Sequence, residues 1–146
     1  MESLQKYDIR KISIFLEEHD IRPSQKRIML MYYLMKYRNH PTIDDMFLAL
    51  HDFIPTLSKT TVYNTMDMFV SHGVVKGLSI DEKQMRYDAD ISPHAHFLCN
   101  SCGRLFDVPI KENAISLLKS MSPEDMQTTE ISIYYKGICR ECKNKY

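Results

Sequence analysis

The four cysteines of the chain fall into two pairs of identical spacing, Cys99-x-x-Cys102 and Cys139-x-x-Cys142. Each pair can present two thiolates to one ion from a tight turn, and a structural zinc ion takes four such sulfurs in a tetrahedron. The intervening residues 103–138 are more than a single zinc ribbon usually has, but they can hold a strand, a helix and a returning strand. Zinc ligation would therefore fix the topology of this part of the chain.

A redox-active C-x-x-C site and four reduced, unligated thiols are the alternatives. Two matched pairs favour zinc, because a single C-x-x-C is a far weaker signal. A domain of about sixty residues also has a marginal core that needs such a link. Between the pairs, the pattern predicts an extended segment at 105–110, an amphipathic helix at 112–121 and an alternating strand at 128–135.

Length and composition predict a globular cytoplasmic protein. With 146 residues and 44% apolar content, the chain can build one moderate core or two small ones. Its longest apolar stretches, such as 28–34, are too short to cross a bilayer, and residues 1–11 lack the apolar core of a signal peptide. In a reducing compartment, paired cysteines hold metal or do redox chemistry more often than they form disulfides.

The N-terminal half predicts helices followed by a hairpin. Apolar residues recur at helical spacing in four segments, and Ser24 and Ser58 precede two of these segments as N-caps. The third segment begins at Thr42, where Asp44 and Asp45 suit the positive end of the helix dipole. Gly73 supplies a left-handed stop after the fourth. The predicted elements are helices at 5–19, 25–37, from Thr42, and from Ser58 to Gly73, then strands at 74–80 and 85–88. This order is typical of a winged helix-turn-helix.

The polar face of the fourth predicted helix suits DNA. It carries cation, hydroxyl, phenol and amide groups, which match phosphate oxygens, base edges and thymine methyls in a major groove. These residues are Lys59, Thr60, Thr61, Tyr63, Asn64 and Asp67. A helical interaction module with a solvated polar face is the alternative. Nineteen basic residues balance nineteen acidic ones, so any DNA affinity must come from local placement of charge.

A second group of metal-ligand residues lies near the first cysteine pair. His94 and His96 share one face of a strand, because residues two apart must. Asp88 and Asp107 flank this strand in sequence, and His40 lies in the loop before the third predicted helix. Imidazole pairs and carboxylates bind divalent metals. The alternative is that each residue is an ordinary surface polar group.

Several ordered motifs together resemble the ferric uptake regulator family over roughly residues 10 to 145. They are His40-Pro41-Thr42-Ile43-Asp44-Asp45, Ser58-Lys59-Thr60-Thr61-Val62-Tyr63-Asn64, Arg86-Tyr87-Asp88, and His94-Ala95-His96 with Cys99 and Cys102. The resemblance implies a homodimeric bacterial repressor that binds double-stranded operator DNA. It also implies a structural four-cysteine zinc site, separate from a regulatory metal site.

The regulatory ligands of the family's peroxide-sensing branch fall on His40, Asp88, His94, His96 and Asp107. This set without sulfur suits Fe(II) or Mn(II), with cellular availability deciding between metals. Iron-sensing relatives tend to have Glu in place of Asp107 and a further His in the last strand, where this chain has residues 127–131 without one. The resemblance is therefore greatest to the peroxide-sensing branch.

For DNA, the resemblance and the chemistry agree on Tyr63 as a base-reading residue. Ser58, Lys59, Thr61 and Asn64 are expected to contact phosphates or bases. Arg22 and Arg27 are candidates for backbone contacts or structural pairs.

The expected mechanism is a clamp in which the regulatory metal fixes the angle between two domains and so lets a dimer meet successive major grooves. Peroxide would then react with bound Fe(II) and oxidise His40 or His94, releasing the metal and the DNA. Such a single-use event is not enzymatic turnover.

Four other interpretations compete. An iron-responsive repressor is the main rival, and a zinc-responsive one would recruit a cysteine, although all four are committed. A zinc-dependent hydrolase would activate water at the His/Asp cluster, but five protein ligands leave the metal little room. A zinc-ribbon interaction protein leaves His40, Asp88 and Asp107 unexplained.

The sequence thus predicts an α+β protein of two domains. Residues 1–86 form a winged helix-turn-helix domain, 87–92 a hinge, and 93–146 a small α/β dimerisation domain with the four-cysteine zinc site. The predicted function is that of a metal-dependent DNA-binding repressor with Zn²⁺ as structural and Fe²⁺ or Mn²⁺ as regulatory metal.

Overall fold

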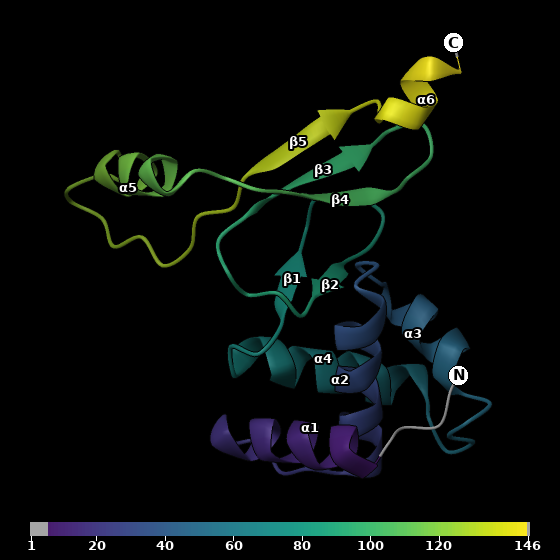
Figure 1. The fold of residues 1–146 in the computed structure, drawn as a ribbon. Helices are drawn as coiled ribbons and strands as arrows, with labels where there is room; N and C mark the ends of the chain where they lie inside the picture. The colour runs from purple at the N-terminus through teal and green to yellow at the C-terminus, as the bar shows by residue number, and fades with distance from the viewer. Residues whose placement is uncertain (1–5, 146) are drawn as a thin grey trace. The chain divides into compact units, whose positions relative to one another are not determined.

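The computed structural model describes residues 6–145 of the chain (Figure 1). Within these residues the elements are α1 (Lys6–Glu18), α2 (Gln25–Tyr37), α3 (Ile43–Leu50), α4 (Lys59–Ser71), β1 (Lys76–Leu78), β2 (Arg86–Asp88), β3 (Ala95–Cys99), β4 (Leu105–Val108), α5 (Glu112–Ser120), β5 (Tyr134–Gly137) and α6 (Arg140–Asn144). Helices dominate the first part and a small sheet the second, which confirms the predicted α+β class.

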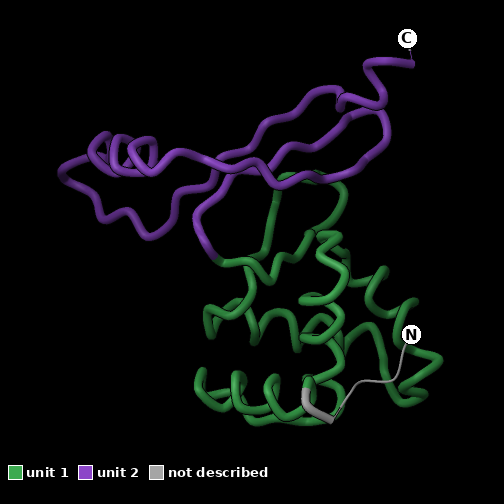
Figure 2. The backbone as a smooth tube through the Cα atoms, viewed as in Figure 1, with its two compact units in different colours: residues 1–91 green, residues 92–146 purple. Residues whose placement is uncertain are grey.

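Contacts divide the chain after Ile91 into two compact units, called here the helical unit and the sheet unit (Figure 2). The division falls within the predicted hinge, 87–92, although β2 already includes residues 87 and 88. The described chain, residues 6–145, has no helix that combines the length and apolar content needed to cross a bilayer.

Local capping chemistry sets where the helices of the helical unit begin. Ser24 and Ser58 each accept a hydrogen bond from the backbone N–H three residues on, which satisfies a donor that the helix start would otherwise leave open. Thr42 does the same for α3, and the Asp45 carboxylate accepts from the Thr42 N–H in return, completing a capping box. The N-caps Ser24 and Ser58 were predicted, whereas Thr42 was predicted as the start of the third helix and is its N-cap. Residue 5, the predicted first residue of the first helix, lies outside the described residues.

The end of α4 confirms the predicted left-handed stop. Gly73 has φ +74°, the Val74 N–H bonds to the Phe69 carbonyl, and the Gly73 N–H bonds to the Val70 carbonyl. This pattern is a Schellman motif, in which glycine takes the left-handed backbone without a Cβ penalty. Because Val74 and Phe69 are both buried, the motif directs the chain from α4 into the β1–β2 hairpin.

A single apolar core joins the four helices to the hairpin. Its fully buried side chains include Leu16 of α1, Leu30 of α2, Leu50 of α3 and Phe69 of α4, and Tyr87 of β2 belongs to the same cluster. Strands β1 and β2 pair antiparallel, with Gly77 opposite Tyr87. The order of four helices followed by a packed hairpin is that of a winged helix-turn-helix.

The sheet unit contains a three-stranded sheet in the order β4-β3-β5. Strand β3 pairs antiparallel with β4 and parallel with β5. Helix α5 buries none of its side chains, and Figure 1 shows it beside the strand ends rather than over the sheet. The apolar cluster of this unit consists of three cysteines with Phe97 and Phe106 against them. Such a small core fits the prediction that a metal stabilises it.

Two elements of the sheet unit differ from prediction. The strand predicted at 128–135 is shorter and begins only at Tyr134. Pairing with β3 begins where the His96 N–H donates to the Ile133 carbonyl and His96 lies opposite Tyr134, so residues 128–133 lie before the strand. Helix α6 was not predicted, since the second cysteine pair was interpreted as a turn.

The capping box of α3 provides a test of this local analysis. Thr42→Ala removes the side chain that accepts from the Asp45 N–H, so we expect the free energy of unfolding to fall by about 0.5–2 kcal/mol. Urea denaturation followed by circular dichroism measures this, and Thr42→Ser should restore most of the loss. Equal stability of Thr42→Ala and the unaltered protein would show that the cap contributes nothing.

Candidate metal centres and nucleic-acid interface

The four cysteines converge at one point of the sheet unit. Cys99 ends β3, Cys102 follows in the turn, Cys139 caps α6, and Cys142 lies within it. Their sulfurs all lie within 4.8 Å of one another, and those of Cys102 and Cys139 are 3.8 Å apart. A tetrahedral zinc site with Zn–S bonds of about 2.3 Å has sulfur–sulfur edges of about 3.8 Å. The cluster therefore has the size and donors of a structural zinc site.

Backbone N–H groups prepare this cluster for a cation. Those of Cys102 and Cys139 donate to the Cys99 sulfur at 3.5 and 3.3 Å, and these bonds lower the pKa of Cys99 to about 6. A hydrogen bond with Ser101 lowers the pKa of Cys142, but hydrogen bonding with Cys139, burial, and hydrogen bonding with Cys102 and Cys99 together raise that pKa to about 11. The Cys99 thiolate thus forms readily, whereas Cys142 needs a metal ion to replace its proton.

In the helical unit, His40 and Asp88 lie together although they are far apart in sequence. The His40 Nε2 atom is 3.5 Å from a carboxylate oxygen of Asp88. Strand β2 carries Asp88, and its Tyr87 N–H donates to the Pro41 carbonyl at 3.0 Å. The hairpin thereby holds the loop before α3 so that an imidazole faces a carboxylate.

The backbone of His40 is strained, with φ +51° immediately before a proline. A non-glycine residue in the left-handed region costs on the order of 1–3 kcal/mol and persists only where its surroundings enforce it. Here Arg86 donates to the His40 carbonyl at 3.3 Å and also pairs with Asp81 at 3.1 Å. A hydrogen bond from the Lys83 N–H lowers the pKa of Asp81 below its ordinary value, and the hydrogen bond and charge of Arg86 lower it further. Sequence analysis gave Arg86 no role beyond its place in the Arg86-Tyr87-Asp88 motif.

In the sheet unit, Asp107 lies between two imidazoles. One of its oxygens is 3.1 Å from His94 Nε2 and 3.3 Å from His96 Nε2, and the two rings are 4.4 Å apart. This follows from strand register, because His96 of β3 is directly opposite Asp107 of β4. His94 stands just before β3, where its Nδ1 contacts the Ser92 carbonyl at 2.7 Å. With Nδ1 engaged by the backbone, Nε2 is oriented toward the carboxylate.

The polar residues of α4 occupy its outer face. Lys59, Thr60, Tyr63 and Asn64 are exposed, and the Tyr63 side chain is 55% exposed although it is aromatic. Apolar residues of the same helix, such as Phe69, face the core. An exposed phenol and amide on the second helix of a helix-turn-helix are available to base edges.

Two of the predicted DNA contacts also have structural partners. Lys59 forms a 3.1 Å ion pair with Asp44 of α3, and its ammonium lies 5.7 Å from the centre of the Phe47 ring. The Ser58 hydroxyl caps α4 and lies 2.9 Å from that of Thr61. These contacts fix the start of α4 relative to α3. Direct DNA contacts by these side chains remain predictions.

The start of α2 brings a further cation that sequence analysis left without a role. Arg27 donates to the Arg22 carbonyl at 2.7 Å, and Lys26 reaches the Thr56 carbonyl at 3.4 Å. All three cations line one cavity with residues of α4. The only sequence signal for Lys26 was its place beside Arg27.

The ferric uptake regulator family model matches residues 18–136, which is most of the chain. The chain belongs to the ferric uptake regulator family. This confirms the resemblance that the ordered motifs indicated. The match includes His40, Asp88, His94, His96 and Asp107 in both units and the first cysteine pair.

Named relatives come from two branches of the family. The peroxide-responsive repressor PerR of Staphylococcus aureus is 29% identical, over 99% of this chain and 97% of its own length. A structure of PerR from Streptococcus pyogenes is 26% identical, with a TM-score of 0.51 and 92% of each chain covered. The ferric uptake regulator of Helicobacter pylori has a TM-score of 0.72 over 98% of this chain and 97% of its own, but its identity of 14% shows the shared fold alone.

The cysteine cluster predicts a selective loss of zinc. Cys139→Ser removes one of the four sulfurs, so we expect the purified protein to lose its zinc and the sheet unit to unfold. Elemental analysis should find one zinc per chain in the unaltered protein and in the control Asn100→Ala, which changes an exposed non-ligand in the other pair. Zinc retained by Cys139→Ser at full occupancy would contradict a four-cysteine site.

Proposed function

We propose that this member of the ferric uptake regulator family is a metal-dependent, DNA-binding repressor that senses peroxide through Fe(II) or Mn(II). The observation that carries the proposal is a second donor set made only of nitrogen and oxygen, separate from the all-sulfur cluster. In each unit, a carboxylate lies within 3.5 Å of an imidazole nitrogen. The similarity to peroxide-responsive repressors supports the choice of stimulus.

The two donor sets divide the metals between them. Four thiolates favour zinc, whereas imidazoles with carboxylates suit Fe(II) and Mn(II). Affinity alone would favour zinc or copper at the nitrogen and oxygen set as well, so the supply of metals in the cell decides its occupant. The Asp107 carboxylate lies 3.1 and 3.3 Å from the Nε2 atoms of His94 and His96, so all three groups face the point where a metal ion would bind.

His40 and Asp88 belong to the helical unit, whereas His94, His96 and Asp107 belong to the sheet unit. We assign all five to one regulatory ion, so that metal occupancy restrains the units relative to each other. A homodimer formed through the sheet units would then present two α4 helices to successive major grooves. A coupling free energy of about 1–3 kcal/mol between metal binding and DNA binding changes operator affinity by about 5-fold to 150-fold, which is sufficient for a switch.

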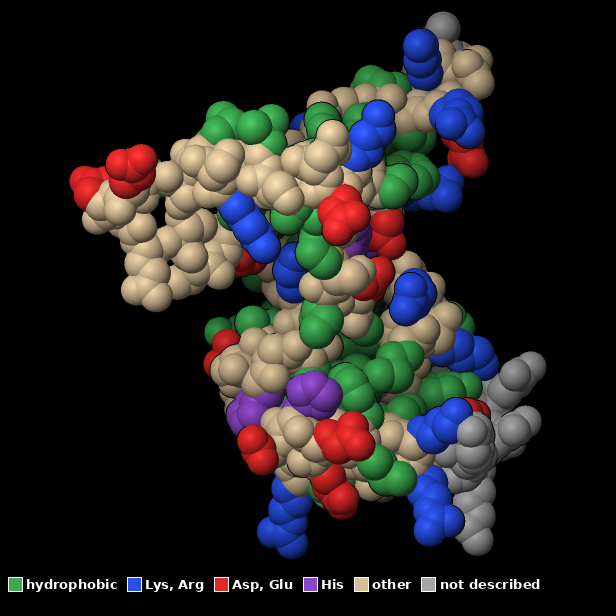
Figure 3. Space-filling view, turned by 60° about the vertical axis from the view of Figure 1, so that its left-hand side comes forward, with side chains coloured by type: hydrophobic (Ala, Val, Ile, Leu, Met, Phe, Trp, Pro, Cys, Tyr) green, Lys and Arg blue, Asp and Glu red, His purple; other side chains and the backbone are tan. Residues whose placement is uncertain are grey.

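DNA binding in this proposal depends on where the charged and polar side chains lie rather than on the net charge of the protein. On the face drawn in Figure 3, cations and carboxylates are interspersed, as the net charge of zero suggests. Non-specific affinity should therefore be weak, since it scales with the phosphates neutralised. Specific binding relies on Tyr63, Asn64 and the dimer, and it would take place in the cytoplasm, where the bacterial chromosome lies.

Peroxide sensing requires a ligand that can be destroyed. Bound Fe(II) supplies the reducing chemistry that activates hydrogen peroxide next to its ligands. We assign the resulting oxidation to the imidazole of His40 or His94, and loss of either nitrogen donor weakens the site. Each protein molecule is consumed by the event, so the protein is a sensor and not an enzyme.

The first test separates metal sensing from folding. His94→Ala removes a ligand at the surface end of β3, so we expect zinc content and thermal stability to be preserved while Mn(II)-dependent DNA binding falls at least 10-fold. Fluorescence anisotropy with an operator obtained by in vitro selection measures the affinity. His51→Ala, which changes a histidine just after α3 and outside the site, is the matched control. A normal Mn(II) response in His94→Ala would remove that residue from the site.

The second test separates peroxide sensing from iron sensing. The Fe(II)-loaded protein is treated with hydrogen peroxide, and peptide mass spectrometry should find one added oxygen atom on His40 or His94 together with loss of DNA binding. The Mn(II)-loaded protein should stay unmodified and bound. An Fe(II) form that remains intact on DNA would instead support an iron-responsive repressor.

A further inference from the structure

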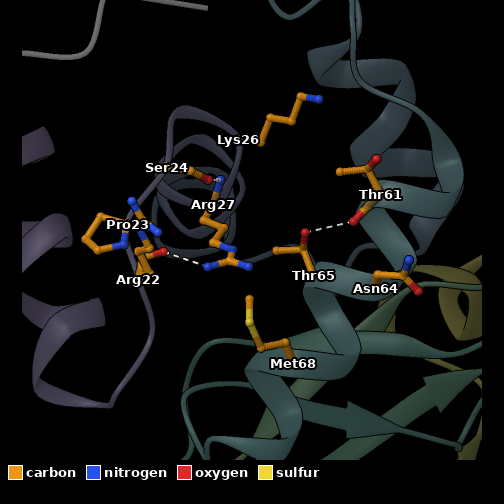
Figure 4. A pocket seen from close by; sticks show the side chains of 9 residues that line it. All are labelled: Arg22, Pro23, Ser24, Lys26, Arg27, Thr61, Asn64, Thr65 and Met68. Carbon is orange, nitrogen blue, oxygen red and sulfur yellow. Dashed lines mark hydrogen bonds between the residues drawn. The ribbon is translucent and has the colours of Figure 1, made fainter.

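A cavity of about 620 Å³ opens in the helical unit between the start of α2 and the outer face of α4 (Figure 4). Its lining includes three cations and no carboxylate. The lining residues are Arg22, Pro23, Ser24, Lys26, Arg27, Thr61, Asn64, Thr65 and Met68. In a chain with equal numbers of acidic and basic residues, such a concentration of one sign is a local feature.

Hydrogen bonds hold these cations in place around the cavity. Arg27 donates one guanidinium N–H to the Arg22 carbonyl at 2.7 Å, and Figure 4 shows its guanidinium between the two helices. A guanidinium has five N–H donors, so this bond fixes its position and leaves most of its donors for another group. Lys26 extends along the rim toward the Thr56 carbonyl, 3.4 Å away.

The neutral lining residues indicate which ligand fits. Thr65 donates its hydroxyl proton to the Thr61 carbonyl at 2.7 Å, so it cannot also donate into the cavity. The Asn64 amide adds a neutral donor at the cavity edge, while Met68 gives the floor an apolar surface. A ligand here meets cationic donors from several sides, which suits a compact anion with several acceptor oxygens.

Geometry connects this cavity to the DNA-reading face. Thr61 and Asn64 line the cavity, and both lie on the polar face of α4 that is assigned to DNA. An anion held here would therefore stand beside the groove that α4 enters. The first turn of α2 contains no acidic residue, and its N-terminal dipole adds to the positive potential of the cations.

We propose that this cavity binds one phosphate group of the DNA backbone and so sets the register in which α4 meets the bases. The proposal rests on the proposed function as a DNA-binding repressor. Phosphate contacts of this kind position a protein on the duplex without reading its sequence. Lys26 and Arg22 attract the phosphate oxygens by their positive charge. Arg27 donates one N–H to the Arg22 carbonyl before α2 and its other N–H groups to the same phosphate.

The first experiment measures the salt dependence of DNA binding by the full-length protein loaded with zinc and Mn(II). Lys26→Gln and Arg22→Gln each remove one cavity cation, whereas Arg10→Gln removes an exposed cation of α1 as a matched control. We expect each cavity variant to lower affinity for selected and random duplexes by a similar factor. The slope of log affinity against log salt should fall by about 1 per chain. The control should keep both its affinity and its slope.

The second experiment locates the phosphate on the operator. Single backbone phosphates are replaced by neutral methylphosphonates, one position at a time. At one position in each half-site, we expect the replacement to weaken binding by the unaltered protein severalfold but to cost Lys26→Gln almost nothing. Equal losses for both proteins at every position would overturn the proposal.

Inorganic phosphate distinguishes a DNA phosphate from a free one. We expect no saturable binding of millimolar inorganic phosphate in calorimetry. Saturable binding that Lys26→Gln abolishes, with its DNA salt slope unchanged, would show a site for free phosphate and overturn the proposal. If the unaltered protein binds DNA and both cavity variants keep its slope of log affinity against log salt, the phosphate proposal is overturned and the proposed function is not. Absence of metal-dependent DNA binding by the unaltered protein would overturn both.

Discussion

The contact between the His40-Pro41 loop and strand β2 is the constraint on which the regulatory half of the structure depends. The Tyr87 N–H bonds to the Pro41 carbonyl and Arg86 bonds to the His40 carbonyl, so β2 holds a strained imidazole against Asp88. Tyr87 also belongs to the core that packs α4. The same strand therefore carries a candidate metal ligand and supports the helix assigned to DNA.

The sheet unit uses two different kinds of donor for two purposes. Four sulfurs at tetrahedral spacing close a unit whose apolar cluster is otherwise small, and their role is structural. His94, His96 and Asp107 lie at the other end of β3, where no sulfur competes. The five residues with nitrogen and oxygen donors are divided between the units. Under the proposed function, one ion bound by all five would restrain the units, and oxidation of a ligand by peroxide would release that restraint.

Local features were predictable and non-local ones were not. Ser24 and Ser58 were predicted as N-caps, because capping depends on a few neighbouring residues. The start of β5 depends on its parallel register with β3, a strand much earlier in the chain, in which His96 lies opposite Tyr134. The five candidate ligands were singled out by their metal-binding chemistry and assigned to one regulatory site by the family resemblance, whereas the pairing of His96 with Asp107 required the register of the sheet. Likewise, Lys26 acquires a role only when α2 and α4 form a cavity together.

Small-angle X-ray scattering of the zinc-loaded protein during a Mn(II) titration tests the central claim most directly. If one ion restrains the two units, we expect the distribution of interatomic distances to change and sharpen up to one Mn(II) per chain, with no change in His96→Ala. Scattering curves that stay identical while calorimetry shows Mn(II) bound at that stoichiometry would contradict the claim.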